Sequence, residues 1–87
     1  MGFRVVFTKQ AQKDVKLLNG AKLVDKAKKL VEVIKENPFE NPPPYEKLQG
    51  DLKGLYSRRI NIQHRLVYEV LEEEQTIKII RMWTHYE

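Results

Sequence analysis

The sequence predicts an α+β domain in which two N-terminal helices pack on a small, mainly antiparallel sheet. Three observations lead to this fold class: an alternating apolar pattern at the start, two stretches with helical apolar spacing, and three strand-like runs in the second half. The element order is strand–helix–helix–strand–strand–strand, and the short connections favour antiparallel neighbours. At 87 residues the chain suffices for one domain, residues 1–87, without room for a second.

The first twenty residues predict a strand followed by a short helix. Phe3, Val5 and Phe7 occupy alternate positions, which is typical of a strand. Thr8 comes next and can cap the helix with its hydroxyl oxygen. The apolar positions of this helix are Ala11, Val15 and Leu18, and Asn19-Gly20 ends it.

A longer second helix is expected over residues 21–36. Its apolar stripe consists of Leu23, Ala27, Leu30, Val31 and Ile34, and lysines populate the other side. Asn37-Pro38 stops the helix, because a proline disfavours helical backbone in the residue before it. Residues 38–54 hold all four prolines and two of the four glycines, which indicates a stiff, irregular connection.

Three strands are expected after this connection, over residues 56–62, 65–71 and 76–83. These runs are rich in β-branched and aromatic residues. A turn around Gln63 separates the first two, and the acidic turn Glu72-Glu73-Glu74-Gln75 separates the last two. Turns this short join antiparallel strands. Tyr68 and Trp83 are expected to pack in the core.

The composition excludes several classes of function. The chain has no cysteine, so disulfides and thiolate metal sites cannot form and a reducing cytoplasm is permitted. Only two histidines occur, and there is no P-loop, dinucleotide-binding glycine motif or HExxH motif, so we expect neither a cofactor nor a metal. No apolar run is long enough for a signal peptide or a membrane span, which predicts a cytoplasmic protein without membrane contact.

The net charge of +4 favours anionic partners only mildly, and solubility explains it equally well. Its distribution is more informative, because four of the five arginines lie in residues 45–87 while lysines dominate the first half. Arginines bind phosphate through a fork of donors. The total charge is nevertheless too small to predict that the chain binds DNA unaided.

Polar residues that can carry chemistry are concentrated at predicted strand ends and at the C-terminus. They are Glu46, Arg58, Arg59, His64, Arg65, His85 and Tyr86. Metal-free RNA cleavage needs a base for the 2′-hydroxyl, positive charge for the phosphorane and an acid for the 5′-oxygen, and these residue types supply all three. Taken singly, each has a structural explanation: Glu46 as a solvated loop acid, His64 as a turn residue, or Arg65 paired with Glu69.

Several motifs in the second half of the chain favour catalytic roles for these residues over the structural ones. They are EKL at 46–48, LKGLYSRRI at 52–60, HRLVY at 64–68 and HY at 85–86. At these spacings the sequence resembles the YoeB branch of the RelE toxin superfamily. The resemblance implies a microbial-RNase-like fold and a metal-independent endoribonuclease, an mRNA interferase that cleaves the codon in the ribosomal A site by 2′-hydroxyl attack and so inhibits translation.

The resemblance also implies a role for each matching residue. Glu46 matches the general base, Arg65 the transition-state arginine, His85 the catalytic histidine and Tyr86 the tyrosine that positions the substrate. The residues expected at the RNA are Arg59, which matches a phosphate-binding arginine, together with Arg58, Lys47 and Lys53. The sequence departs from the family pattern at two positions. Gln49 stands where the family often has a lysine, and Lys47 or Lys53 would then supply that charge. Glu87 follows the tyrosine, where several relatives end.

The partners implied by the resemblance are the ribosome, its mRNA and a cognate, YefM-like antitoxin with an acidic, partly disordered tail. Operator DNA is expected only through the antitoxin, and a homodimer and a toxin–antitoxin hetero-oligomer are both open. Two other functions stay open: a ParE-like toxin of the same fold that poisons DNA gyrase, and an antitoxin-bound co-repressor. A gyrase poison would not need the set of Glu46, Arg65, His85 and Tyr86, so its completeness favours the ribonuclease.

Overall fold

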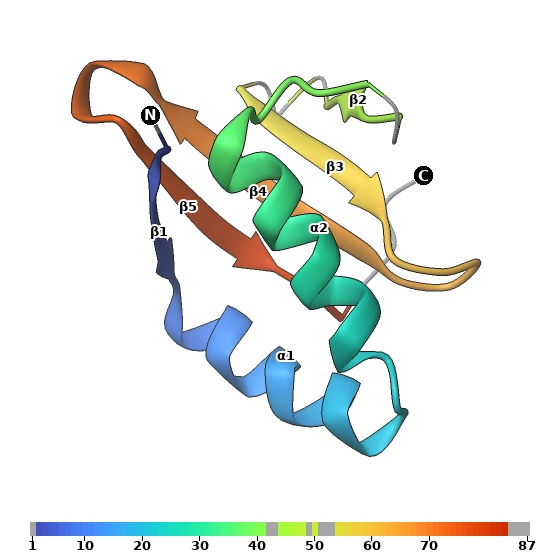
Figure 1. Cartoon of the computed structure of the whole chain (residues 1–87). Helices are drawn as coiled ribbons and strands as arrows, with labels where there is room; N and C mark the ends of the chain where they lie inside the picture. Colours follow the sequence, from blue (N-terminus) through green and yellow to red (C-terminus); the bar gives the residue numbers. More distant parts are fainter. Residues whose placement is uncertain (1, 42–43, 49, 51–53, 84–87) are drawn as a thin grey trace.

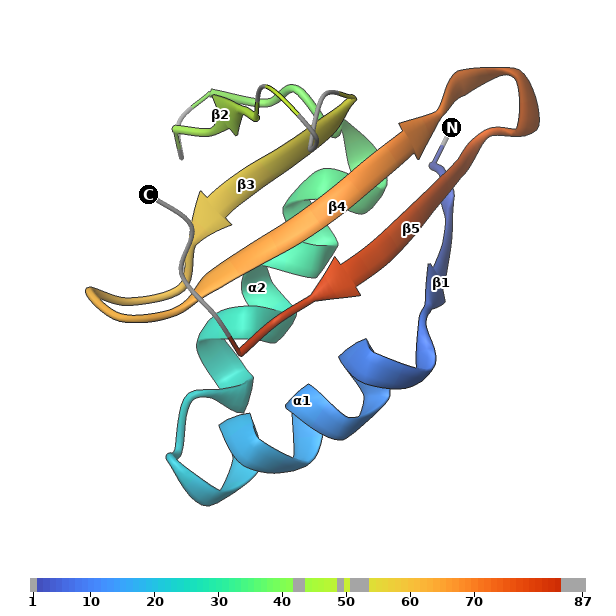
Figure 2. The ribbon, with the colours of Figure 1, turned by 180° about the vertical axis from the view of Figure 1, so that it is seen from behind.

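Two helices and a five-stranded sheet make up the fold of the computed structural model (Figure 1). The structure describes residues 2–41, 44–48, 50 and 54–83. Helix α2 (Val24–Glu36) crosses one face of the sheet, and the view from behind shows the sheet in front of it (Figure 2). Helix α1 (Lys9–Gly20) lies beside α2. The predicted α+β class is confirmed.

The sheet is mixed, with one parallel pair of strands. In spatial order it contains β1 (Arg4–Phe7), β5 (Thr76–Arg81), β4 (Arg65–Leu71), β3 (Leu55–Arg59) and β2 (Glu46–Lys47). β1 runs parallel to β5, and the other neighbours are antiparallel. The sequence predicts every strand except β2, because two residues carry no readable alternation and their pairing partner comes from β3.

The first strand and helix form as predicted. The Arg4 N–H donates to the Gln75 carbonyl oxygen at 2.8 Å, which attaches β1 to the start of β5. Thr8 caps α1, since its hydroxyl oxygen accepts from the Ala11 N–H at 3.0 Å. The same hydroxyl donates to the Ile80 carbonyl oxygen at 3.0 Å. One side chain therefore both begins the helix and joins it to β5.

Helix α2 begins at Val24 rather than at the predicted residue 21. Lys22 adopts a left-handed backbone conformation with φ 62°, and the Leu23 N–H donates to the Leu18 carbonyl oxygen at 2.8 Å. This arrangement closes the C-terminus of a helix. Residues 21–23 thus belong to the end of α1. The sequence did not predict this boundary because glycine, and not lysine, usually occupies the left-handed position.

Two strands end earlier than predicted. β3 stops at Arg59 because residues 60–64 form a wider turn, in which Asn61 Oδ1 accepts from the N–H groups of Gln63 at 2.9 Å and His64 at 2.7 Å. β5 stops at Arg81 because the Asp14 carboxylate of α1 accepts hydrogen bonds from the next two backbone N–H groups, those of Met82 and Trp83. In both places a side-chain acceptor takes donors that would otherwise extend the sheet.

The core lies between the helices and the sheet. Its buried apolar residues include Ala11, Leu18, Ala27, Ile34, Leu66, Tyr68, Ile77 and Ile79. Tyr68 packs there as predicted; burial raises the pKa of its hydroxyl, which donates to the Pro38 carbonyl oxygen at 2.8 Å. Trp83 is half-buried against this core. Among the residues described, no helix has the length and apolar character to cross a membrane.

Candidate active site

A carboxylate and a guanidinium that the sequence predicted to act together are in contact. Arg65 begins β4, and Glu46 lies on β2, with β3 between the two strands. Arg65 Nη1 is 3.1 Å from Glu46 Oε2 and donates to the Ser57 hydroxyl at 3.3 Å. The Arg65 side chain is 16% exposed, whereas that of Glu46 is 65% exposed. The guanidinium is therefore held against β3, and the carboxylate is open to a ligand.

A second arginine faces the same site. Arg59 and Arg65 are direct partners in the register of β3 and β4. Like charges at opposed positions repel each other, so this pair favours an anion beside it. Both arginines line a pocket of about 220 Å³, together with Pro44, Tyr45, Glu46 and Ser57. Two forked cations and one carboxylate suit a phosphodiester whose neighbouring hydroxyl must lose a proton.

The predicted RNA-binding role of Arg58 does not fit its position. Alternation along β3 directs Arg58 to the face opposite that of Arg59, and Arg58 is only 1% exposed. Its Nε donates to the Tyr68 hydroxyl at 3.2 Å and its Nη2 to the Pro38 carbonyl oxygen at 3.0 Å. Its guanidinium also lies over the Tyr45 ring, 5.1 Å from the centroid. Arg58 thus supports Tyr45, a wall of the pocket, from inside the protein.

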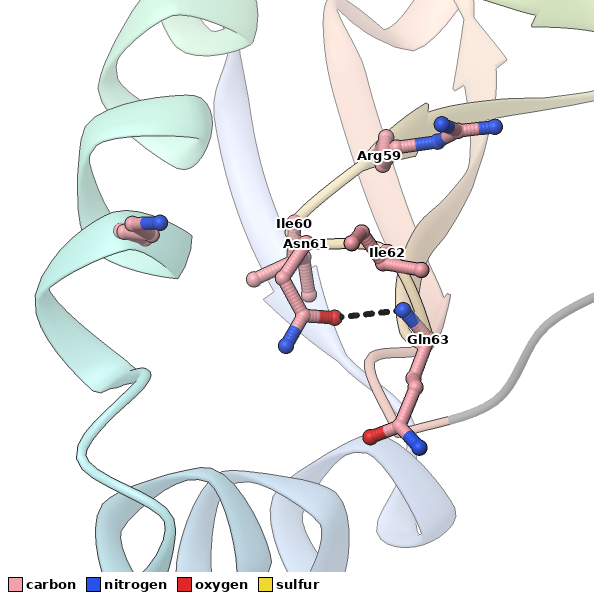
Figure 3. Close-up of a pocket in the computed structure, with 6 residues that line it drawn as sticks. Arg59, Ile60, Asn61, Ile62 and Gln63 are labelled. Atoms are coloured by element: carbon pink, nitrogen blue, oxygen red, sulfur yellow. Dashed lines mark hydrogen bonds between the residues drawn. The ribbon is translucent and has the colours of Figure 1, made fainter.

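Arg59 also lines a wider groove (Figure 3). It is lined by Lys26 of α2 and by residues 59–63, and its volume is about 740 Å³. Figure 3 shows the Arg59 side chain pointing away from α2. Arg59 lines both the groove and the 220 Å³ pocket. The sequence gives no signal for Lys26 as a groove residue, because its position on α2 resembles that of any lysine on a solvated helix face.

His64 stacks on Trp83 instead of facing the Glu46–Arg65 pair. The two ring centroids are 3.8 Å apart and the ring planes differ by 18°. Its Nδ1 is buried and has no hydrogen-bond partner among the residues described. The His64 carbonyl oxygen accepts from the Ile60 N–H at 2.8 Å, which closes the turn before β4. His64 therefore lies in a turn, which is the structural explanation that the sequence offers for it. Its ring stacks on Trp83 and so holds Trp83 next to the start of β4.

The remaining predicted residues divide into two groups. Lys47 is exposed on β2 next to Glu46. His85, Tyr86, Lys53 and Gln49 lie outside the described residues. Ser57 was missed as a site residue, although its place directly before the two arginines of the SRRI motif was an available signal. Within residues 2–41, 44–48, 50 and 54–83, no three histidine or acidic side chains gather closely enough to hold a metal ion.

This chain is similar to solved structures of bacterial toxins. A YoeB/ParE toxin from Agrobacterium tumefaciens aligns with a TM-score of 0.87 at 33% identity, covering 95% of this chain and 99% of that chain. YoeB of Staphylococcus aureus, solved as a dimer, aligns with a TM-score of 0.83 at 38% identity, covering 99% and 100% of the two chains. In a YoeB–YefM complex from the same organism the TM-score is 0.81, at the same identity and coverage. The fold is that of small toxins of toxin–antitoxin systems.

Sequence comparison shows to which family within this class of toxins the chain belongs. Toxin YoeB of Synechocystis is 36% identical over 69 residues, which are 79% of this chain and 78% of that protein. The family model for the YoeB-like toxin of bacterial type II toxin–antitoxin systems matches residues 7–86. The chain belongs to this family of YoeB-like toxins. The predicted resemblance is confirmed, and the match extends over both helices.

Proposed function

We propose that this toxin is an mRNA endoribonuclease that cleaves the codon in the ribosomal A site and so inhibits translation in the cytoplasm. The observation that carries the proposal is the contact between Glu46 and Arg65 at 3.1 Å, in a pocket that Arg59 also lines. A proton acceptor thus lies beside two guanidinium groups. This combination suits the cleavage of a phosphodiester by its own 2′-hydroxyl, which needs a base and positive charge at the phosphorane.

The proposed reaction is an intramolecular transesterification. Glu46 takes the proton of the 2′-hydroxyl, the 2′-oxygen bonds to phosphorus, and the bond between phosphorus and the 5′-oxygen breaks. His85 gives a proton to the departing 5′-oxygen, and Tyr86 positions the substrate. The products are a 2′,3′-cyclic phosphate and a 5′-hydroxyl. The reaction balances without an oxidant, a cofactor or a metal-bound water.

The arginines act on the charge of the phosphorane. Arg65 and Arg59 direct forked donors at the non-bridging oxygens, and the loss of one such donor typically costs about 10²–10³-fold in rate. Glu46 must release Arg65 when the phosphate enters. Because the Glu46 side chain is 65% exposed, water can solvate its carboxylate when the ion pair separates.

The position of Trp83 supports the role proposed for His85. Trp83 stacks on His64, and His64 directly precedes Arg65 in the chain. Two residues of extended chain span at most about 7 Å. We therefore propose that the general acid at position 85 acts from this segment of the chain. Lys47 and Lys53 are proposed to contact the RNA backbone nearby.

We also propose that a YefM-like antitoxin with an acidic tail restrains the toxin and is its only link to operator DNA. Charge attraction to the exposed lysines would mainly speed the encounter, while apolar burial would hold the complex, and the toxin could enter it as a monomer or a dimer. Bound antitoxin is expected to slow backbone hydrogen exchange within residues 45–69 or 81–87. The measurement compares free and bound toxin by mass spectrometry. If the exchange rate is unchanged in both segments, the antitoxin does not cover the active site.

The chemistry of the RNA ends tests the proposed function. Purified toxin is treated with EDTA, desalted and added to ribosomes programmed with a defined mRNA, and the cut is mapped by primer extension. We expect a cut in the A-site codon at the rate of untreated toxin, leaving a 2′,3′-cyclic phosphate or a 3′-phosphate. A 5′-phosphate would indicate metal-activated water. Growth arrest with intact mRNA and trapped gyrase–DNA complexes would instead support a gyrase poison.

A further inference from the structure

One buried carboxylate ties the end of β5 to helix α1. Asp14 is fully buried, and its Oδ2 accepts hydrogen bonds from Arg81 Nε at 2.9 Å, the Met82 N–H at 3.0 Å and the Trp83 N–H at 3.3 Å. Its Oδ1 accepts from the Gln10 side chain at 3.2 Å. Burial by itself would raise the pKa of Asp14, but the hydrogen bonds from Met82, Arg81 and Gln10 lower it below the ordinary value. The carboxylate is therefore charged at neutral pH.

These bonds set the direction in which the chain leaves the sheet. Met82 and Trp83 follow the last residue of β5, and both of their N–H groups point at one oxygen. Since the peptide unit is planar, two consecutive bonds of this kind fix the orientation of the backbone between them. The stack of Trp83 on His64, with ring centroids 3.8 Å apart, holds the same segment from the side of β4.

We infer that Asp14 is a positioning residue that, with the His64–Trp83 stack, fixes residues 82–83, from which the chain continues to the proposed catalytic pair His85-Tyr86. This inference rests on the proposed function, which gives the terminal pair its role. A catalytic group displaced by about 1 Å can lose on the order of 10²-fold in rate. An anchor at residues 82–83 limits such a displacement.

Two substitutions at position 14 test the inference against two controls. Asp14→Ala removes the acceptor, whereas Asp14→Asn keeps an oxygen for the backbone donors and loses the charge. Asp25→Asn removes the charge of an exposed acid on the other helix, and Ile34→Ala truncates a fully buried core residue. All four are assayed by single-turnover cleavage of ribosome-bound mRNA, at a temperature where circular dichroism shows each variant folded.

Asp14→Ala is expected to lower the maximal rate by about 10–100-fold and to leave the half-saturating ribosome concentration unchanged, because only the alignment of the terminus is lost. Asp14→Asn should lie between Asp14→Ala and the unsubstituted toxin. Trp83 is the only tryptophan of the chain, so its fluorescence reports on the anchored segment. Its emission should move to longer wavelength and become easier to quench with acrylamide in Asp14→Ala, but in neither control.

An unchanged rate for Asp14→Ala would overturn the inference. So would a rate loss without a change in Trp83 emission, or an equal loss in Ile34→Ala, because Asp14 would then act through stability alone. If Asp14→Ala does not fold, Asp14→Asn decides by the same two measurements. Failure of the unsubstituted toxin to cleave ribosome-bound mRNA refutes the proposed function, and the Trp83 emission then still tests whether Asp14 anchors the segment.

Discussion

Alanine in place of Arg65 or His85 is expected to lower the rate of mRNA cleavage by about 10²–10⁴-fold, roughly 3–5 kcal/mol of activation free energy. Arg65 is the only residue that the structure shows in contact with both the Glu46 carboxylate and the Ser57 hydroxyl, within the range it describes. Its loss leaves the developing phosphorane charge with Arg59 alone. Loss of His85 leaves the 5′-oxygen without its proton donor. Cells that express either variant should therefore continue to grow.

The controls for this prediction separate chemistry from folding. Arg4→Ala removes an exposed arginine from β1, which is the edge of the sheet opposite β2, and should leave toxicity intact. Arg65→Lys keeps the charge without the forked donors, so its rate should fall between those of Arg65→Ala and the unsubstituted toxin. Circular dichroism and thermal denaturation check that each variant is folded. If both Arg65→Ala and His85→Ala stay fully toxic, the catalytic roles assigned to Arg65 and His85 are wrong.

Cleavage of ribosome-bound mRNA is expected to exceed cleavage of the same RNA free in solution by about 10² or more, because alignment of the reacting groups is worth several kcal/mol. The pocket of about 220 Å³ and the groove of about 740 Å³ have one lining residue in common, Arg59, and the groove adds no second arginine to those of the pocket. Few charged groups are therefore available to bring the 2′-oxygen, phosphorus and 5′-oxygen of flexible RNA into line. A ribosome that holds the codon in one conformation supplies that alignment.

The measurement compares single-turnover rates on one mRNA, first with ribosomes stalled at a chosen codon and then without ribosomes. Moving the stall by one codon should move the cut by one codon. Ribosomes whose A site is filled by a transfer RNA provide the matched control, since they contain the same RNA with the site blocked. Equal rates on free and bound RNA would point to a general ribonuclease.

Local patterns were sufficient to predict that both helices exist, though not where α2 begins, and to identify the chemical groups. Thr8 caps α1 as predicted, because a cap depends on residues within one turn. Glu46 and Arg65 were singled out by residue type and by their match to the family motif, and they do lie in contact. Helix spacing, capping and motif matching all act within short stretches of chain, so they can be read without the fold.

Contacts between distant segments decided the rest. The sequence predicted that Arg58 and Arg59 would both meet RNA, yet alternation on β3 turns Arg58 toward Tyr68 and Pro38. Strand β5 was predicted to reach Trp83, but Asp14, which looked like an ordinary polar residue of α1, takes the donors that follow Arg81.

The chain by itself therefore specifies two helices, the strands with readable alternation and the residue types for phosphodiester cleavage. The folded structure alone settles which arginine faces the pocket, where strands β3 and β5 end, and that Asp14 holds the segment before the terminus. The physical reason is that these features depend on which donor finds which acceptor across many residues of chain. Those pairings are made only when the sheet and helices pack together.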